Sequence, residues 1–279
     1  MMKRKNKKSK YFYSLIGVFL LFIMIIGIVS SLGSINKQSK KTKELFTVES
    51  RTKNIEETVI TSDSSYRVIG WLRMEGTNID YPVLYSTNRS FDFPVELESY
   101  VWSENFDPNF HNMINLMGHN IFNLSSTPKI HSEKFKRLEE LMAYVYYDFA
   151  KENKYIQFTI DGKDYVYKIF AVDFIKNADV TSFPAGDDYD EEEMKEQISL
   201  LRKESLYQYD VDVNEKDSLI SIYTCTRFFG TSPYYQVIVN GRLLRDNEEI
   251  TDYKVTTTKK YSKIEKKLKG DDNNEEDSL

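Results

Sequence analysis

The chain has 279 residues, of which 41% are hydrophobic and 29% charged, and this composition fits one core-forming domain with extensions at its ends. Its single cysteine excludes an internal disulfide bond. The formal net charge is −5, and no nucleic-acid motif accompanies the one basic block, so we expect no nucleic-acid partner. The sequence also lacks a glycine-rich phosphate loop, a Gly-x-Ser-x-Gly elbow and a dinucleotide fingerprint, and we expect no cofactor.

The N-terminus predicts a membrane anchor. Residues 1–10 form a basic segment that we expect to be cytoplasmic, and residues 11–34 form an apolar span without charged residues. Such a span crosses about 30 Å of hydrocarbon as a helix, which places the rest of the chain on the extracellular side of the cell membrane. The alternative is a cleaved signal peptide with a small-residue site at 31–33. The apolar stretch exceeds the usual signal-peptide core of about 7–15 residues, which favours a retained, single-pass anchor.

Residues 35–65 are polar with scattered apolar positions, which predicts a helical stalk. A β-rich domain is expected over residues 66–247. Alternating or apolar runs bounded by turn residues predict strands at 68–74, 79–84, 112–117, 155–160, 165–174, 219–225 and 236–244. Their spacing favours an all-β barrel or sandwich.

Two helices are expected between these strands. Apolar positions at helical spacing predict the first from Glu133 to about Ala150 and the second from Asp190 to Leu206, where Asp190 resembles an N-terminal cap. Residues 248–279 are charged and end in an acidic run, so we expect a disordered C-terminal tail.

Cys225 is the candidate nucleophile. It closes the run Ser221-Ile222-Tyr223-Thr224-Cys225, whose β-branched and aromatic residues predict a buried strand that ends in a thiol. A cysteine at the rim of a strand is a plausible nucleophile when a histidine reaches it, because thiol catalysis pairs a thiolate with a base. The alternative is that Cys225 is an inert packing residue.

Three histidines are candidate partners: His111, His119 and His131. His119 follows an apolar strand and Gly118, which permits a turn or the close approach of another chain. His111 lies in a loop, and His131 is expected at the start of a helix, so neither has a comparable setting. The histidines lack helical His-x-x-x-His spacing and one cysteine cannot complete a closed zinc site, so no metal site is expected.

Five segments with distinctive residues follow one another between residues 68 and 225. They are Val-Ile-Gly-Trp-Leu at 68–72, Gly-Thr-Asn-Ile-Asp-Tyr-Pro-Val at 76–83, Met-Gly-His-Asn at 117–120, the segment 135–141 leading to Tyr-Asp at 147–148, and Ser-Ile-Tyr-Thr-Cys at 221–225. In this order they resemble class B sortases, whose Thr-Leu-x-Thr-Cys pattern the last segment matches with Ser for Thr and Ile for Leu. The resemblance runs from about residue 66 to 245, and the helix at 190–206 resembles an insertion that marks class B.

The resemblance implies a mainly β fold, a sortase-type β-barrel with N-terminal helices and a helix inserted before the cysteine strand. It also implies a cysteine transpeptidase of Gram-positive bacteria. Cys225 would attack a backbone carbonyl in the C-terminal sorting signal of a secreted protein and form a thioester, with His119 as proton donor to the leaving amine. An amine of a peptidoglycan precursor or of a pilin would then resolve the thioester.

One position departs from the family pattern. Class B sortases carry an arginine early on the strand after the cysteine, and Gln236 stands there. We expect Arg227 to substitute, because residues 225 and 227 of an extended strand project to the same face. The alternative is that Arg227 is an exposed loop residue. Gln236 retains a neutral hydrogen-bond donor, and with Tyr223 and Thr224 it is expected to line the substrate site.

Two other functions remain open. A papain-like thiol hydrolase would resolve the acyl-enzyme with water, although that family's local cysteine motif is missing. A surface-tethered binding domain with impaired catalysis is favoured by the missing arginine.

Overall fold

The computed structural model of the chain divides into two units, residues 1–47 and 48–279, and every residue described below belongs to the second unit. The structure describes residues 66–86, 101–103, 112–125, 127–135, 137–160, 162–176, 189–229 and 235–269. The predicted basic segment, membrane anchor and stalk therefore lie outside the described residues. Within the described part, no helix has both the length and the apolar character needed to cross a bilayer.

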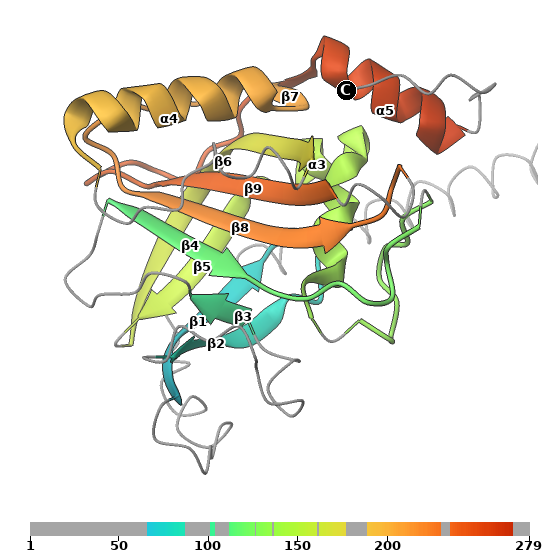
Figure 1. Cartoon of the computed structure of the whole chain (residues 1–279). Helices are drawn as coiled ribbons and strands as arrows, with labels where there is room; N and C mark the ends of the chain where they lie inside the picture. The colour runs from blue at the N-terminus through green and yellow to red at the C-terminus, as the bar shows by residue number, and fades with distance from the viewer. Residues whose placement is uncertain are drawn as a thin grey trace, which may run out of the picture. The chain divides into compact units, whose positions relative to one another are not determined.

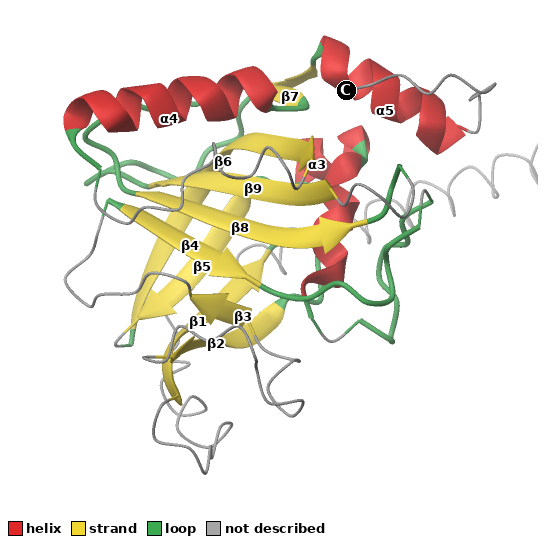
Figure 2. Cartoon of the chain, in the orientation of Figure 1, coloured by secondary structure: helices red, strands yellow, loops and turns green. Residues whose placement is uncertain are grey.

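Strands form most of the described domain (Figures 1 and 2). They are β1 (Tyr66–Met74), β2 (Asp80–Ser86), β3 (Val101–Ser103), β4 (Met113–Met117), β5 (Tyr155–Ile160), β6 (Lys163–Lys176), β7 (Tyr207–Tyr209), β8 (Leu219–Thr226), β9 (Tyr235–Leu243) and β10 (Val255–Thr257). A closed barrel runs in the order β1-β2-β3-β4-β8-β9-β6-β5, and β7 pairs with β10 outside it. The predicted β-barrel is confirmed. The short strands β3, β7 and β10 were not expected from the sequence, because three residues are too few to show a period.

The strand β8 lies between two partners that are distant in sequence. It is parallel to β4, with Met117 paired to Tyr223, and antiparallel to β9, with Cys225 paired to Gln236. Side chains of both partners pack into the same apolar core as Ile220 and Ile222 of β8. These registers decide which side chains surround the end of the cysteine strand.

The helices are η2 (Leu138–Val145, a 3-10 helix), α3 (Tyr147–Glu152), α4 (Glu191–Glu204) and α5 (Lys259–Lys269). The predicted helix at 190–206 is confirmed by α4. The Asp190 carboxylate caps this helix, since it accepts hydrogen bonds from the backbone N–H groups of Glu192 and Glu193. In return the Asp190 backbone N–H donates to the Glu193 carboxylate at 3.0 Å. This reciprocal capping satisfies N–H groups that lack partners within the helix.

The helix expected from Glu133 to about Ala150 is wrong in its extent and type. The chain first becomes helical at Leu138, and Tyr146 has the extended backbone angles φ −93° and ψ 123°, which separates η2 from α3. Every residue of η2 is buried, including Glu139 and Glu140. A segment that is enclosed on all sides has no single apolar face, so helical periodicity was a poor guide to its bounds.

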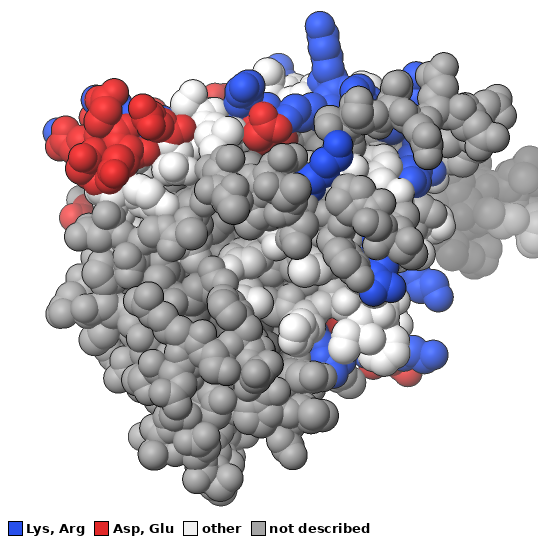
Figure 3. Space-filling view, in the orientation of Figure 1, with Lys and Arg blue, Asp and Glu red and all other residues white. Residues whose placement is uncertain are grey.

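The tail expected to be disordered from residue 248 is ordered as far as residue 269. It contains β10 and α5, and Val255, Tyr261 and Ile264 are buried. The apolar residues recur at the spacing of one helical face, but the surrounding lysines dominated the composition. Lysine side chains project around α5, whereas acidic side chains gather over the start of α4 (Figure 3).

Candidate active site

The end of β8 presents the sulfur to solvent. Successive side chains of a strand point to opposite faces, so Cys225 shares a face with Tyr223. Cys225 is exposed and Tyr223 is half-buried. Neighbouring protein atoms remove part of the water around the sulfur, and this desolvation raises the pKa of the Cys225 thiol above its usual value. The sulfur is therefore mainly a thiol at neutral pH, and its attack on a carbonyl needs a base.

His119 lies in the segment that continues beyond β4, and Gly118 decides how this segment packs. A Cβ atom at Gly118 would lie 2.6 Å from Cγ of Leu138, closer than real Cβ atoms approach other atoms. The absence of a side chain thus allows η2 to approach, and the Leu138 N–H donates to the His119 carbonyl at 3.2 Å. The His119 side chain remains half-exposed.

Three hydrogen bonds fix this segment against β8. The Gly118 N–H donates to the Tyr223 carbonyl at 3.3 Å, and the Thr224 hydroxyl donates to the Gly118 carbonyl at 2.6 Å. One residue further along, the Asn120 side-chain amide donates to the Cys225 carbonyl at 3.0 Å. These bonds lie before and after His119, so the backbone of the histidine is held beside that of the cysteine.

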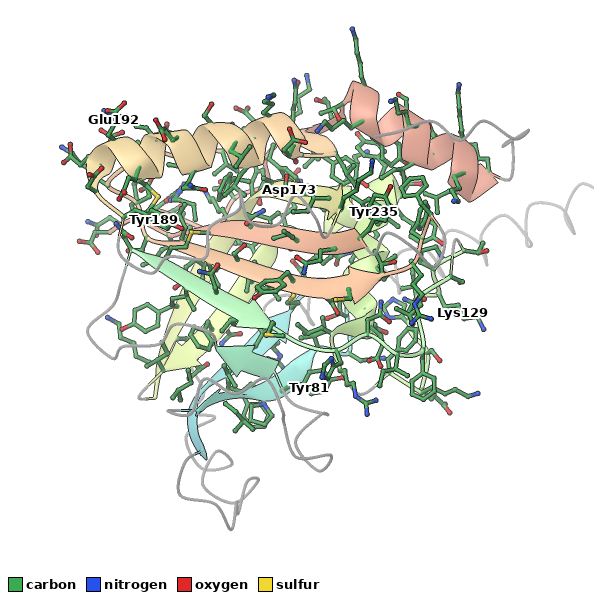
Figure 4. The ribbon with its side chains drawn as sticks, viewed as in Figure 1. Tyr81, Lys129, Asp173, Tyr189, Glu192 and Tyr235 are labelled. Carbon is green, nitrogen blue, oxygen red and sulfur yellow. The ribbon has the colours of Figure 1, made fainter. Side chains whose placement is uncertain are left out.

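Asn120 is a positioning residue that the sequence reasoning missed. It is 6% exposed, and besides its bond to Cys225 its side chain exchanges two hydrogen bonds with the backbone of Asn123. The Asn123 amide in turn donates to the carbonyls of Lys129 and Glu139, which closes the loop after His119 over the start of η2. Lys129 lies in this loop, beyond the end of β8 (Figure 4). The sequence feature that could have indicated this role is the pair Asn120 and Asn123, which directly follows His119.

The structure brings Gln236 directly opposite Cys225 on the antiparallel partner strand. Directly opposed residues place their Cβ atoms about 4.5–5.5 Å apart, so Gln236 occupies the position beside the sulfur where the family pattern has arginine. Arg227 belongs to neither of these two strands. The strand β8 ends at Thr226, so the expected strand geometry does not reach Arg227. Its backbone N–H donates to the Leu124 carbonyl at 3.2 Å, and its side chain is exposed. Arg227 therefore lies in the segment after β8, and its backbone is hydrogen-bonded to the loop that follows His119.

Thr224 faces the interior of the domain. It is 1% exposed, points away from the face of Cys225, and its hydroxyl donates a hydrogen bond to the Gly118 carbonyl.

His131 does not begin a helix; its φ is 56°, its ring is exposed, and its Nδ1 lies 3.8 Å from a carboxylate oxygen of Glu140. Burial raises the pKa of Glu140. His111 lies outside the described residues.

A family profile described as the sortase domain matches residues 72–244, which is more than half of the chain. The chain belongs to the sortase family. Sortases are cysteine transpeptidases that act on proteins with a sorting signal and transfer them to an amine, and this chain is a transpeptidase of that type. No curated protein matches the sequence at a significant level.

Solved sortase B structures share the fold of this sortase. Sortase B of Clostridium perfringens superposes with a TM-score of 0.55 at 20% identity, over 70% of this chain and 100% of that one. A sortase B–substrate complex of Staphylococcus aureus gives 0.54 at 18% identity, over 77% and 95%. Sortase B from the type II pilus of Streptococcus pneumoniae gives 0.50 at 17%, over 63% and 91%. The expected sortase-type β-barrel is thereby confirmed, with the predicted N-terminal helices outside the described residues.

Proposed function

We propose that this sortase is a membrane-anchored transpeptidase in which Cys225 and His119 act on the C-terminal sorting signal of a secreted protein. The single observation that carries the proposal is the set of hydrogen bonds on either side of His119, which ties its segment to the strand that ends at Cys225. Both side chains reach solvent, so a peptide can approach them.

The reaction follows from these two groups. His119 takes the proton from the Cys225 sulfur as the sulfur attacks the carbonyl carbon, and the carbonyl oxygen becomes an oxyanion. When this intermediate collapses, the C–N bond breaks and His119 gives the proton to the leaving amine, which leaves a thioester. An acceptor amine then attacks the thioester, the C–S bond breaks, and His119 returns the proton lost by the amine to the sulfur.

The oxyanion needs a hydrogen-bond donor or a cation. Arg227 supplies the charge from the loop beside Cys225, and the Gln236 amide supplies a neutral donor from the opposite strand. Tyr223, on the same face as the sulfur, forms a wall of the substrate site. Thr224 has no substrate contact in this proposal, because its hydroxyl holds Gly118.

The proposed location rests on the sequence of residues 1–65. The basic segment and the apolar span predict a single pass with the catalytic domain outside the cell, where sortases of Gram-positive bacteria work. The acceptor is an amine of a peptidoglycan precursor or of a pilin, and the pneumococcal sortase B named for its pilus supports the second source.

The choice between amine and water as acceptor tests the function. The full chain in detergent is incubated with a pool of synthetic peptides varied over five positions, and intact-mass spectrometry identifies the peptides that form a covalent adduct. We expect added triglycine, a lysine-containing peptide or hydroxylamine to accelerate loss of the adduct and to appear in the product. Release that no amine accelerates would establish the thiol hydrolase instead. Absence of any adduct, with iodoacetamide still labelling Cys225, would establish the binding domain.

Arg227→Gln tests the proposed cation. At effective dielectric constants of about 40–80, a unit charge about 6 Å from a reacting atom changes the rate of attack on a charged reagent by about three- to tenfold. Loss of the charge slows the anionic reagent and speeds the cationic one by this factor, so we expect the ratio of Cys225 labelling rates, anionic sulfonatoethyl over cationic trimethylammonioethyl methanethiosulfonate, to fall by about 10- to 100-fold. Adduct formation with the best peptide should slow by about 10²–10³-fold, as for the loss of one oxyanion donor.

Lys129→Gln is the matched control, because it removes one positive charge from an exposed side chain in the loop that follows His119. We expect it to leave both measurements within about twofold, as is usual for an exposed charge screened by solvent. An Arg227→Gln variant that behaves like this control would assign the oxyanion to Gln236 and remove Arg227 from the mechanism.

A further inference from the structure

The residues directly after β8 are fixed by their surroundings. The Arg227 N–H donates to the Leu124 carbonyl, and the Phe228 N–H donates to the Thr226 hydroxyl, both at 3.2 Å. Phe228 is completely buried and Phe229 is half-buried. The backbone position of Arg227, two residues beyond Cys225, therefore depends on where these two aromatic rings are held.

The two rings belong to a cluster at the end of the sheet. Phe228 and Phe229 have centroids 5.0 Å apart, and each lies 5.4 Å from Phe174 of β6 in an edge-on arrangement. Phe229 also lies 5.1 Å from Tyr235 of β9, which sits at the end of that strand nearest α5 (Figure 4). Edge-to-face contacts of this kind stabilise specific ring orientations.

The helix α5 completes the cluster from outside. Nζ of Lys267 lies 4.4 Å from the ring centroid of Phe229 and 5.6 Å from that of Phe228, within the range of cation–π attraction. Ile264 is buried and, with Phe174 and Tyr235, lines a small cavity of about 160 Å³ between α5 and the sheet.

The start of α5 is anchored separately from this cluster. The Thr258 hydroxyl donates to the Leu206 carbonyl at 2.8 Å, and the Tyr261 ring lies 5.2 Å from the Tyr207 ring. Lys260 pairs with Glu204 at the end of α4. The helix is thus held at one end by contacts remote from the active site, and its other end is available to hold the aromatic rings.

The sortase profile ends at residue 244, whereas α5 begins at Lys259, so this helix lies outside the matched part of the chain. We propose that α5 is a positioning element of the active site: Lys267 holds Phe228 and Phe229 in the aromatic cluster and thereby keeps Arg227 beside Cys225. This inference rests on the proposed function only for the role of Arg227.

Lys267→Met tests the inference in the full chain, because methionine keeps an apolar side chain and removes the cation. We expect hydrogen exchange at the amides of Arg227 and Phe228 to become about two- to fivefold faster, the effect of losing one cation–π contact at the weaker end of the usual range. The ratio of Cys225 labelling by the anionic and cationic methanethiosulfonates should move toward the value of Arg227→Gln. Lys267→Arg retains the cation and should restore both measurements. Phe229→Leu removes the ring from the other side and should change both in the same direction as Lys267→Met.

Lys266→Met is the matched control, since it removes the same charge from an exposed neighbour on α5. A wild-type exchange rate and labelling ratio in Lys267→Met, alongside a shifted ratio in Arg227→Gln, would overturn the role of α5 and leave the proposed function standing. Faster exchange in Lys267→Met with an unshifted ratio in Arg227→Gln would instead overturn the role of Arg227, and with it the last step of this inference.

Discussion

Replacing Cys225 with alanine is expected to abolish covalent adducts with every peptide and to lower turnover by at least about 10³-fold, because no other thiol exists in the chain. The side chain is exposed, so the substitution should change the free energy of unfolding by no more than about 0.5 kcal/mol. Intact-mass spectrometry after incubation with the peptide pool measures the first effect, and thermal unfolding measures the second.

The wild-type thiol supplies a companion measurement. Because desolvation raises its pKa, the fraction of thiolate grows with pH beyond the usual range of a free thiol. The rate of labelling by iodoacetamide should therefore keep rising past pH values of about 8.5, the ordinary pKa of cysteine. A plateau well below that pH would mean that a nearby cation holds the sulfur ionised, and an adduct that persists in Cys225→Ala would refute the assignment of the nucleophile.

Replacing His119 with glutamine should slow adduct formation by about 10²–10⁴-fold, the usual contribution of a positioned general acid–base. Glutamine keeps a hydrogen-bonding side chain but cannot carry the proton from the sulfur to the leaving amine. The rate of adduct formation in a single turnover isolates this step from the later attack of the acceptor. Labelling of Cys225 by iodoacetamide at pH above its pKa should continue, which would show that the thiol itself is intact.

The matched control is His131→Gln, because His131 is an exposed histidine of the same loop region. The buried Glu140 carboxylate beside it also accepts two hydrogen bonds from Asn78, so it keeps partners in this variant, and we expect adduct formation within about twofold of wild type. If the His119 variant were to retain more than about a third of the wild-type rate, proton transfer would have to come from another group or from water, contrary to the expected range.

The local sequence pattern was sufficient to predict a strand or helix where that element is half-buried or begins with a clear capping residue. Alternation predicted the strand that ends at Cys225, and the acidic start predicted the cap at Asp190 that the structure contains. Pattern failed for η2, which is buried on all sides, and for α5, whose three apolar residues are outnumbered by lysines. In both segments the decisive contacts come from other parts of the chain, and composition does not record them.

The site shows the same division. Neighbouring residues of β8 face opposite sides of the sheet, so Thr224 is buried and donates to the Gly118 carbonyl whereas Cys225 is exposed. The side-chain amide of Asn120 donates to the Cys225 carbonyl, and this contact exists only because the fold brings the two residues together. The two residues are 105 positions apart.

By itself, the sequence determined the chemistry that is available: one sulfur at the end of a strand, a histidine after a glycine, and glutamine where the family pattern has arginine. Only the tertiary structure decided which side chains lie near the sulfur. The parallel pairing of β4 with β8 brings the segment of His119 to the end of the cysteine strand, and the antiparallel pairing with β9 sets Gln236 opposite Cys225. Strand pairing depends on apolar surface contributed by the whole barrel, and so no local stretch of residues specifies it.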